Sequence, residues 1–289
     1  MTHRWCGSPA VTYLPNVSLP AYNQGMQLVL SLFPGVGLLD RAFREAGFCV
    51  VTGPDRIIGG DVREFAAVPG KFDGIIGGPP CQGFSQANRH ASDPSHESVV
   101  NSRAMVGEFL RVVRQANPTW FLMENVPRVP DVREPGFEVQ RFAIDVRECG
   151  SSEQIRLRHF QFGHRDGWIC RPKRNVIQCP KLGPVPKAVT AKQSSKWTRF
   201  ADLCRRQGVP ELALNGWTKQ AKMRAVGNGV PLPMGRVVAE AVRSASVRTV
   251  TDCPCGCGRQ LTGKQRSATC RKTLQTVRAG SRDVITLRS

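Results

Sequence analysis

The sequence lacks any long apolar run. No stretch of its 289 residues approaches the roughly 20 consecutive apolar residues that a membrane-spanning helix needs. The amino-terminal segment also lacks the apolar core of a secretory signal. The 11 cysteines form an odd number in a long chain without such a signal, so we expect reduced thiols rather than a disulfide scaffold. These absences predict a soluble, intracellular protein without a membrane partner.

Acidic residues are scarce. The chain has 22 Asp and Glu against 41 Lys and Arg, which gives a net charge of +19. The excess of basic residues is concentrated in two segments. Residues 165–224 contain 14 basic and 3 acidic residues, and residues 248–289 contain 9 basic and 2 acidic residues. Lys and Arg neutralise phosphates, so this partition predicts a polyanion partner, most simply nucleic acid. The alternative is a charged face that is merely solvated.

Apolar patterning predicts a doubly wound, mostly parallel α/β sheet. A buried strand, "QLVLSLF", leads through the glycine turn "PGVG" into an amphipathic helix, which is the opening unit of that fold class. Strands are predicted at 27–33, 48–52, 72–78, 119–125 and, antiparallel, 154–163; helices are predicted at 38–48, around 105–113, at 137–149 and at 231–245.

The same patterning divides the chain into five segments. We expect a disordered arm at 1–25, a catalytic and cofactor-binding domain at 26–164, a short, irregular and basic recognition subdomain at 165–218, a helix packing back on the catalytic domain at 219–247, and a basic cysteine-containing tail at 248–289.

The stretch "GGPPCQGFS" places Cys81 on an exposed loop. Two prolines stiffen the approach to it, while Gly83 and Ser85 leave room beside the sulfur. A nucleophilic thiol must be reachable and partly ionised, so this loop is a candidate nucleophile loop. The alternative is an inert loop cysteine.

Two further motifs carry ionisable groups. "MENVP" puts Glu124 at the end of a strongly apolar strand, where desolvation raises the pKa of a carboxyl group. The alternative role for Glu124 is to cap a helix or to pair with an arginine. "QIRLR" sets Gln154, Arg156 and Arg158 at period two, hence on one face of a strand. Two adjacent guanidinium groups need an anion or a carboxylate between them, unless this is simply a solvated strand face.

Taken together, these motifs resemble the DNA (cytosine-5) methyltransferase family. "LFPGVGLLDRAFREAGF", "GGPPCQGFS", "MENVP", "QIRLR" and the closing "AVGNGVPLPMGRVVAEAV" follow one another in that family's order, and "RFADLCRRQGVPE" is a loose match to a further motif. The short form "LFPGVGLLDRAF" is similar to phage-borne members. The resemblance implies the S-adenosylmethionine-dependent methyltransferase fold, and an enzyme of a mobile or viral genome that works in the cytoplasm of a bacterial or phage-infected cell.

The resemblance also implies roles for individual residues. Cys81 would bond C6 of a flipped-out cytosine, and Glu124 would bind the base at N3 and its amine. Arg156 would lie beside Glu124, where it would act as an orienting residue and stabilise an anion. Arg158 would have a structural role or would face a phosphate. The residues implied for S-adenosylmethionine are Phe33, Gly35, Gly37, Leu38, Asp55, Asp61, Pro79, Asn228 and Val230.

The chain departs from the family in two places. Only 12 residues separate Phe48 from Asp61, where the family usually has an acidic ribose ligand, a helix and a third strand, so Asp55 is the nearest ribose candidate. The target-recognition region is compressed to roughly residues 165–200 and predicts no particular DNA sequence.

The tail contains a cysteine cluster. Cys253, Cys255, Cys257 and Cys270 are candidate zinc ligands in a small knuckle, although the first three are more closely spaced than the usual pair; the alternative is a disordered basic tail. The expected partners are double-stranded DNA and a cognate restriction endonuclease, and the chain is expected to be a monomer. Two other functions stay open: an RNA cytosine-5 methyltransferase, and a catalytically silent DNA-binding module.

Overall fold

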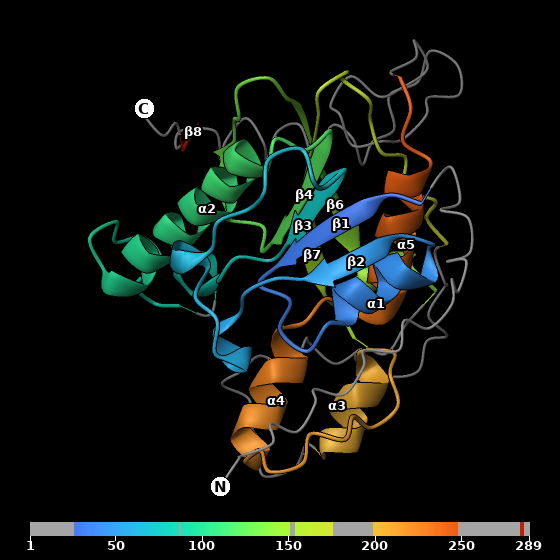
Figure 1. Ribbon diagram of the computed structural model, residues 1–289. Coiled ribbons are helices and arrows are strands. Elements are labelled where there is room, and N and C mark those ends of the chain that lie inside the picture. Colours follow the sequence, from blue (N-terminus) through green and yellow to red (C-terminus); the bar gives the residue numbers. More distant parts are fainter. Residues whose placement is uncertain (1–25, 87, 151–153, 176–198, 248–283, 286–289) are drawn as a thin grey trace, which may run out of the picture.

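The central element is a six-stranded, mostly parallel sheet. The computed structural model describes residues 26–86, 88–150, 154–175, 199–247 and 284–285. The sheet order is β2-β1-β3-β4-β7-β6, in which β2, β1, β3 and β4 are parallel and β7 runs antiparallel to both of its neighbours (Figure 1). Its strands are β1 (Leu28–Leu32), β2 (Cys49–Thr52), β3 (Gly74–Gly77), β4 (Trp120–Asn125), β6 (Glu138–Asp145) and β7 (Leu157–His164). The predicted fold class is confirmed.

Five α-helices and several short turns complete the described part of the chain. The helices are α1 (Leu38–Glu45), α2 (Glu97–Ala116), α3 (Phe200–Arg206), α4 (Lys219–Asn228) and α5 (Leu232–Arg243). The 3-10 turns are η1 (Arg56–Ile58), η2 (Val62–Glu64), η3 (Gln82–Phe84) and η4 (Val146–Glu148). A separate two-residue ladder pairs β5 (Asp131–Val132) with β8 (Val284–Ile285). No helix among these is long and apolar enough to cross a membrane.

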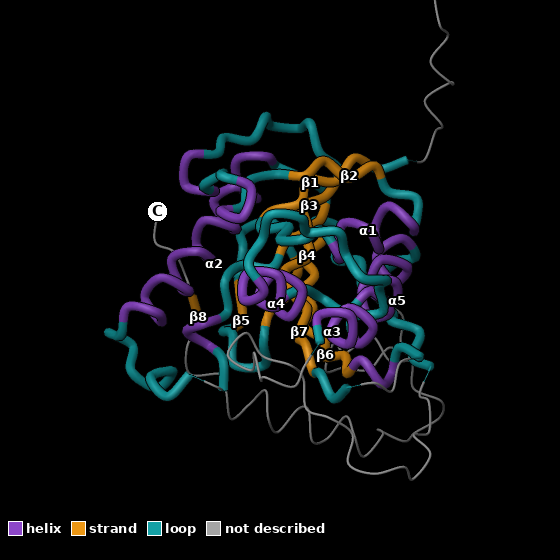
Figure 2. Tube along the Cα trace, turned by 90° about the horizontal axis from the view of Figure 1, so that it is seen from below, coloured by secondary structure: helices purple, strands orange, loops and turns teal. Residues whose placement is uncertain are grey.

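Helices cover the two faces of the sheet. Helix α2 packs on one face, and α1 and α5 pack on the other, as the end-on view shows (Figure 2). Each strand contributes side chains to the apolar cores on both faces of the sheet, because successive side chains point to opposite faces. In β4, for example, Trp120 and Leu122 join the α1–α5 core, whereas Phe121 and Met123 join the α2 core. The continuous apolar runs in the sequence reflect this two-sided burial.

The predicted helix at 137–149 is wrong. Residues 138–145 form strand β6, whose alternate residues Gln140, Phe142 and Ile144 are buried. The apolar residues of this segment also fit a helical template, so periodicity alone did not separate the two alternatives. Antiparallel pairing with β7 decides in favour of the strand, and the buried amide of Gln140 is satisfied by the backbone of Cys170.

Helix α5 packs closely against α1. Gly235 makes this possible, because a Cβ at that position would lie 2.8 Å from the Cβ of Ala42. An ion pair between Arg236 Nε and Glu45 Oε2, 2.6 Å apart, joins the two helices at the surface. The segment that follows α4 in sequence is therefore fixed against the first helix of the sheet.

Strand β2 is an edge of the sheet. In the part of the chain that the structure describes, no strand lies beyond it, and the chain passes from Thr52 through η1 and η2 directly to β3. The strand order reverses about β1, whose two neighbours β2 and β3 follow it in sequence. In open α/β sheets the carboxyl ends of the strands at such a reversal form a crevice where ligands bind.

Candidate active site

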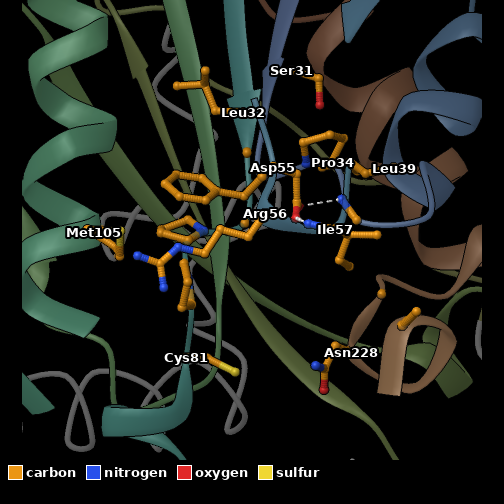
Figure 3. A pocket seen from close by; sticks show the side chains of 18 of the residues that line it. Ser31, Leu32, Pro34, Leu39, Asp55, Arg56, Ile57, Cys81, Met105 and Asn228 are labelled. Atoms are coloured by element: carbon orange, nitrogen blue, oxygen red, sulfur yellow. Dashed lines mark hydrogen bonds between the residues drawn. The ribbon is translucent and has the colours of Figure 1, made fainter. Parts of the chain in front are cut away.

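A cavity of about 460 Å³ lies at the carboxyl ends of β1, β3 and β4. Its lining includes Cys81, Glu124 and Arg158 together with eight of the nine residues expected at a cofactor site: Phe33, Gly35, Leu38, Asp55, Asp61, Pro79, Asn228 and Val230. Figure 3 shows Cys81 and Asn228 on opposite sides of the cavity, with Asp55 and Pro34 farther along it. Segments far apart in sequence thus meet at one crevice.

The loop that carries Cys81 is anchored to α2. Cys81 immediately precedes η3, and its backbone (φ −101°, ψ 3°) lies in a sparsely populated region where active-site residues are often found. Gly83 donates its N–H to Ser102 Oγ at 2.9 Å, and a Cβ at Gly83 would lie 2.5 Å from the carbonyl oxygen of Ser98. Only glycine allows this approach, so the packing of the loop on α2 sets the position of the thiol.

The surroundings of Cys81 disfavour ionisation of its thiol. Burial raises the pKa of Cys81 above its ordinary value, and the negative charge of Glu124 raises it further. The charges of Arg158 and Arg156 oppose this effect. The ionisation of Cys81 is therefore coupled to the charge of Glu124: when that carboxylate is neutralised, the pKa of the thiol falls.

Glu124 forms an ion pair with Arg158. Arg158 Nε lies 2.8 Å from Glu124 Oε1, and both side chains are mostly buried. Burial raises the pKa of Glu124, and the Arg158 charge acts in the opposite direction. Gly78 leaves space beside the pair, because a Cβ there would lie 3.0 Å from Glu124 Oε2. A side chain at position 78 would therefore crowd the second carboxylate oxygen of Glu124.

The expected placement of the two arginines is reversed. Arg156 does not touch Glu124: its Nη2 donates to the carbonyl oxygens of Gly227 at 2.7 Å and Gly229 at 3.0 Å. Burial and the nearby Arg158 charge lower the pKa of Arg156 to about 9, so the guanidinium stays charged at neutral pH. Arg156 therefore holds the turn after α4, while Arg158 is the arginine at the carboxylate.

Gln207 holds the same turn. Its Nε2 donates to Val226 O at 2.6 Å and to Gly229 O at 3.1 Å, and it is fully buried. Gln154 donates in turn to Gln207 Oε1 at 3.3 Å and to Arg206 O at 2.8 Å. This buried amide network fixes the chain on both sides of Asn228. Gln207 had no assigned role in the sequence analysis, although it lies in the loosely matching "RFADLCRRQGVPE".

Two backbone N–H groups of the glycine turn after β1 donate to acceptors within the protein. Asp55 accepts the N–H of Gly35 on Oδ2 and that of Ile57 on Oδ1, both at 2.8 Å. The N–H of Gly37 donates to Pro34 O within the turn, and Gly37 does not line the cavity. Phe33 has φ 54°, a left-handed conformation that is costly for a side chain of this size. The N–H groups of Gly35 and Gly37 are therefore occupied within the protein, and Asp55 helps to fix the shape of the turn.

Asp61 lines the cavity but is held by arginines. Its carboxylate pairs with Arg63 and, at 3.5 Å, with Arg56, and these contacts keep its pKa below the ordinary range. Asp61 also caps η2 by accepting the N–H of Arg63. Asp55 and Asp61 therefore stand on the same side of the cavity, with different partners.

Helix α4 and the residue before its cap form a wall of the cavity, of which the sequence analysis assigned only Asn228. Trp217, Ala221, Arg224, Ala225 and Asn228 all line it. The members of two pairs in α4, Ala221 with Ala225 and Arg224 with Asn228, are four residues apart, which is the spacing of one helical face. That spacing was visible in the sequence, but nothing indicated which face would meet the nucleophile loop.

The predicted zinc ligands Cys253, Cys255, Cys257 and Cys270 lie outside the described residues. Within the described ranges, no group of three or more His, Cys, Asp or Glu side chains is arranged to hold a metal ion.

The sheet order and the cavity at the carboxyl ends of its strands agree with the predicted S-adenosylmethionine-dependent methyltransferase fold. The model of the family described as C-5 cytosine-specific DNA methylase matches residues 28–166 of the chain. The matched region carries Cys81, Glu124 and Arg158.

Related sequences and structures agree with this assignment. The chain is 35% identical over 155 residues to the type II methyltransferase M.FnuDI of Fusobacterium nucleatum, a match of 47% of this chain and 42% of that protein. It is 27% identical over 179 residues to M.HgiDI of Herpetosiphon aurantiacus, a match of 52% and 55%. The chain therefore spans less than two thirds of the length of these relatives.

Solved structures support the fold. The Entamoeba histolytica methyltransferase EhMeth superposes with a TM-score of 0.55 at 10% identity, over 75% of this chain and 98% of that one. The Dnmt2 methyltransferase of S. pombe superposes with a TM-score of 0.50 at 11% identity, over 75% and 97%.

Proposed function

We propose that the protein transfers a methyl group from S-adenosylmethionine to C5 of cytosine in DNA, through a covalent bond between Cys81 and C6 of a flipped-out base. The observation that carries this proposal is the convergence of Cys81, Glu124 and Arg158 with the glycine turn in one cavity. The related type II methyltransferases support it.

The cavity fits a cofactor and a base. Its volume of about 460 Å³ lies within the roughly 300–1,000 Å³ typical of small-molecule sites. Phe33, Gly35 and Leu38 would line the sulfonium end of S-adenosylmethionine, with Asn228 and Val230 closing it from the α4 side. Asp55 would hold the ribose, because each of its carboxylate oxygens accepts one backbone N–H and retains a further lone pair. Asp61 would meet the adenine amine, and Pro79 would border the base.

The reaction then follows from the side chains of the chain. S-adenosylmethionine supplies an electrophilic methyl group on a sulfonium. The Cys81 thiolate adds to C6 of cytosine, and the electron pair of the C5–C6 double bond moves to C5, which takes the methyl group. The cofactor would leave as the neutral thioether, and transfer of the C5 proton to a water molecule would restore the double bond and expel the Cys81 thiolate. Because C6 is inaccessible in a stacked duplex, the base must enter the cavity by flipping.

Glu124 and Arg158 would assist the first step. Protonated Glu124 would donate to N3 of the base, which stabilises the charge that develops on the ring. A protonated Glu124 no longer raises the pKa of Cys81, so base binding and thiol ionisation support each other. Arg158 would hold the carboxyl group in place and bind the base oxygen beside it.

The test is transfer of labelled methyl from S-adenosylmethionine to mixed-sequence DNA, with sequencing to locate the mark. We expect 5-methylcytosine, loss of transfer in Cys81→Ala, and full activity in Cys49→Ala, a matched change at an exposed cysteine. DNA that contains 5-fluorocytosine should form a stable covalent adduct, because fluorine cannot leave as a proton does.

Three results would contradict the proposal: label on adenine, undiminished transfer by Cys81→Ala, or transfer to structured RNA but not to DNA. A cognate restriction endonuclease and a monomeric state also belong to this proposal, and they are tested by co-purification and by the sedimentation mass.

A further inference from the structure

We infer that Arg224 on α4 binds the DNA phosphate next to the flipped cytosine, an inference that rests on the proposed function. Arg224 is exposed and lines the cavity from α4, whereas Gln82, Asn101 and Met105 line it from the nucleophile loop and α2. The cavity therefore has a cationic side chain on one wall and polar and apolar side chains on the other.

The position of Arg224 is rigid. Its neighbours Met223 and Ala225 are buried, and α4 begins with a cap in which Thr218 Oγ1 accepts the N–H of Ala221 at 3.2 Å. At the other end, Arg156 and Gln207 bind the carbonyl oxygens of the final turn. Helix α4 is thus held on both sides of the exposed Arg224 guanidinium. The conformational entropy lost on binding therefore comes mainly from the Arg224 side chain.

The charges around Arg224 favour an anion. Helix α4 contains Lys219, Lys222 and Arg224 and no acidic residue. No carboxylate in the described ranges forms an ion pair with Arg224 or Lys219, while Lys222 is placed over the ring of Phe200, 5.9 Å from its centroid. Arg224 is therefore the cation of α4 that faces the cavity without an internal partner among the described residues.

Geometry identifies the anion as a DNA phosphate. A flipped nucleotide remains joined to its strand on both sides, so its flanking phosphates must lie at the mouth of the cavity that holds the base. Arg224 is exposed, so its guanidinium can be reached by a phosphate that lies outside the cavity. The small side chain of Ala221, three residues before Arg224, also lines the cavity and is partly exposed.

The experiment measures DNA affinity at several salt concentrations, in a Cys81→Ala background that prevents turnover. We expect Arg224→Ala to weaken DNA binding about tenfold and to lower the slope of log affinity against log salt by about 1, as the loss of one phosphate contact requires. Arg224→Lys should restore the slope, because a phosphate also accepts the point charge of lysine. The affinity for S-adenosylmethionine should not change.

Lys71→Ala is the matched control. Lys71 is exposed just before β3, hence at the opposite end of the sheet from the cavity, and its loss should leave the slope unchanged. An unchanged slope in Arg224→Ala, or a fall in S-adenosylmethionine affinity in its place, would overturn the inference. If the parent protein binds or methylates no DNA, the proposed function fails instead, so the two failures are distinguishable.

Discussion

Arg158 and Glu124 are diagonal neighbours on one face of an antiparallel strand pair. The register places Glu124 of β4 opposite Phe160 of β7, so Arg158, two residues earlier, points to the same face, and its Nε reaches Glu124 Oε1 at 2.8 Å. Arg156 lies two residues farther along that face and reaches the turn after α4 instead. The register thus gives two arginines of one motif different partners.

The first prediction separates these two arginines. Arg158→Ala should reduce the rate of methyl transfer by about 100-fold or more, the usual effect of removing one preorganised donor, with little change in cofactor affinity. Arg156→Ala should instead lower the melting temperature and weaken S-adenosylmethionine binding, because the carbonyl oxygens of Gly227 and Gly229 lose their donor. Single-turnover rates, thermal melts and cofactor titration distinguish the two. Equal effects of both changes on the rate alone would contradict this division.

The second prediction concerns the ionisation of Cys81. Glu124→Gln removes a negative charge that raises the pKa of Cys81 and leaves the opposing charges of Arg158 and Arg156. The thiolate fraction at pH 8 should therefore rise, and alkylation of Cys81 by iodoacetamide should become several-fold faster. Mass spectrometry resolves this site from Cys49, which should react at its original rate. Slower alkylation of Cys81 in the variant would show that Glu124 activates the thiol in the free protein.

The third prediction tests the anchoring of the nucleophile loop. Gly83→Ala places a Cβ against the backbone of α2, at 2.5 Å from Ser98 O and 2.6 Å from Val99 Cα, so the loop must shift. We expect methyl transfer to slow at least tenfold while S-adenosylmethionine affinity is retained. Ser102→Ala is the control, because it removes only the hydrogen bond from Gly83 and should cost about 1 kcal/mol of stability. Normal transfer by Gly83→Ala would refute the dependence of the thiol on this packing.

The fourth prediction concerns Asp55. In the parent protein the two carboxylate oxygens of Asp55 accept the N–H groups of Gly35 and Ile57. In Asp55→Asn the single amide oxygen can replace only one of these acceptors, and the amide NH₂ cannot accept the other N–H. The glycine turn should loosen, and S-adenosylmethionine affinity should fall by about tenfold or more, as calorimetric titration would measure. Asp166→Asn changes the same atoms on a side chain that is 70% exposed, and it should have no effect. Unaltered affinity in Asp55→Asn would remove Asp55 from the cofactor site.

The fifth prediction concerns acid stability. Hydrogen bonds from Arg236 and Arg41 lower the pKa of Glu45 to about 2. Since the folded-state pKa lies below the unfolded value of 4.5, the stabilisation is complete above pH 4.5 and is lost as the pH falls toward 2. Its size should be under about 1 kcal/mol, because the partners are partly exposed. Urea unfolding should therefore distinguish the parent protein from Glu45→Gln at pH 7 but not near pH 2.

Most of the sheet could be predicted from sequence. Strands β1, β3 and β4 are short apolar runs bounded by turn residues, and β7 alternates, so each was placed within a few residues of its observed bounds. The apolar residues of β6 fit the periodicity of a helix as well as that of a strand, so the sequence predicts a helix there. The pairing with β7, which decides in favour of the strand, involves a segment later in the chain. The local periodicity of a segment gives no information about which strand it will pair with.

The candidate site could be predicted in composition but not in detail. Period two predicts that Arg156 and Arg158 share one face of a strand, but β7 begins only at Leu157, and which arginine meets Glu124 depends on the register between β4 and β7. The α4 wall with Trp217 and Arg224 depends on how a late helix docks, which no local pattern specifies. The functional roles of Cys81, Glu124 and the cofactor residues remain predictions.

The position of α4 has a consequence for the protein during its synthesis. Cys81, Glu124 and Arg158 follow one another along the chain, and all three precede α4. The wall that α4 contributes to the cavity ends only at Asn228, where Arg156 and Gln207 bind the carbonyl oxygens of the final turn. A nascent chain that has emerged only as far as Cys81 or Glu124 has no closed cavity in which to hold a base. The cavity is therefore complete only once the last turn of α4 has formed, so a chain truncated before Asn228 lacks the wall opposite Cys81.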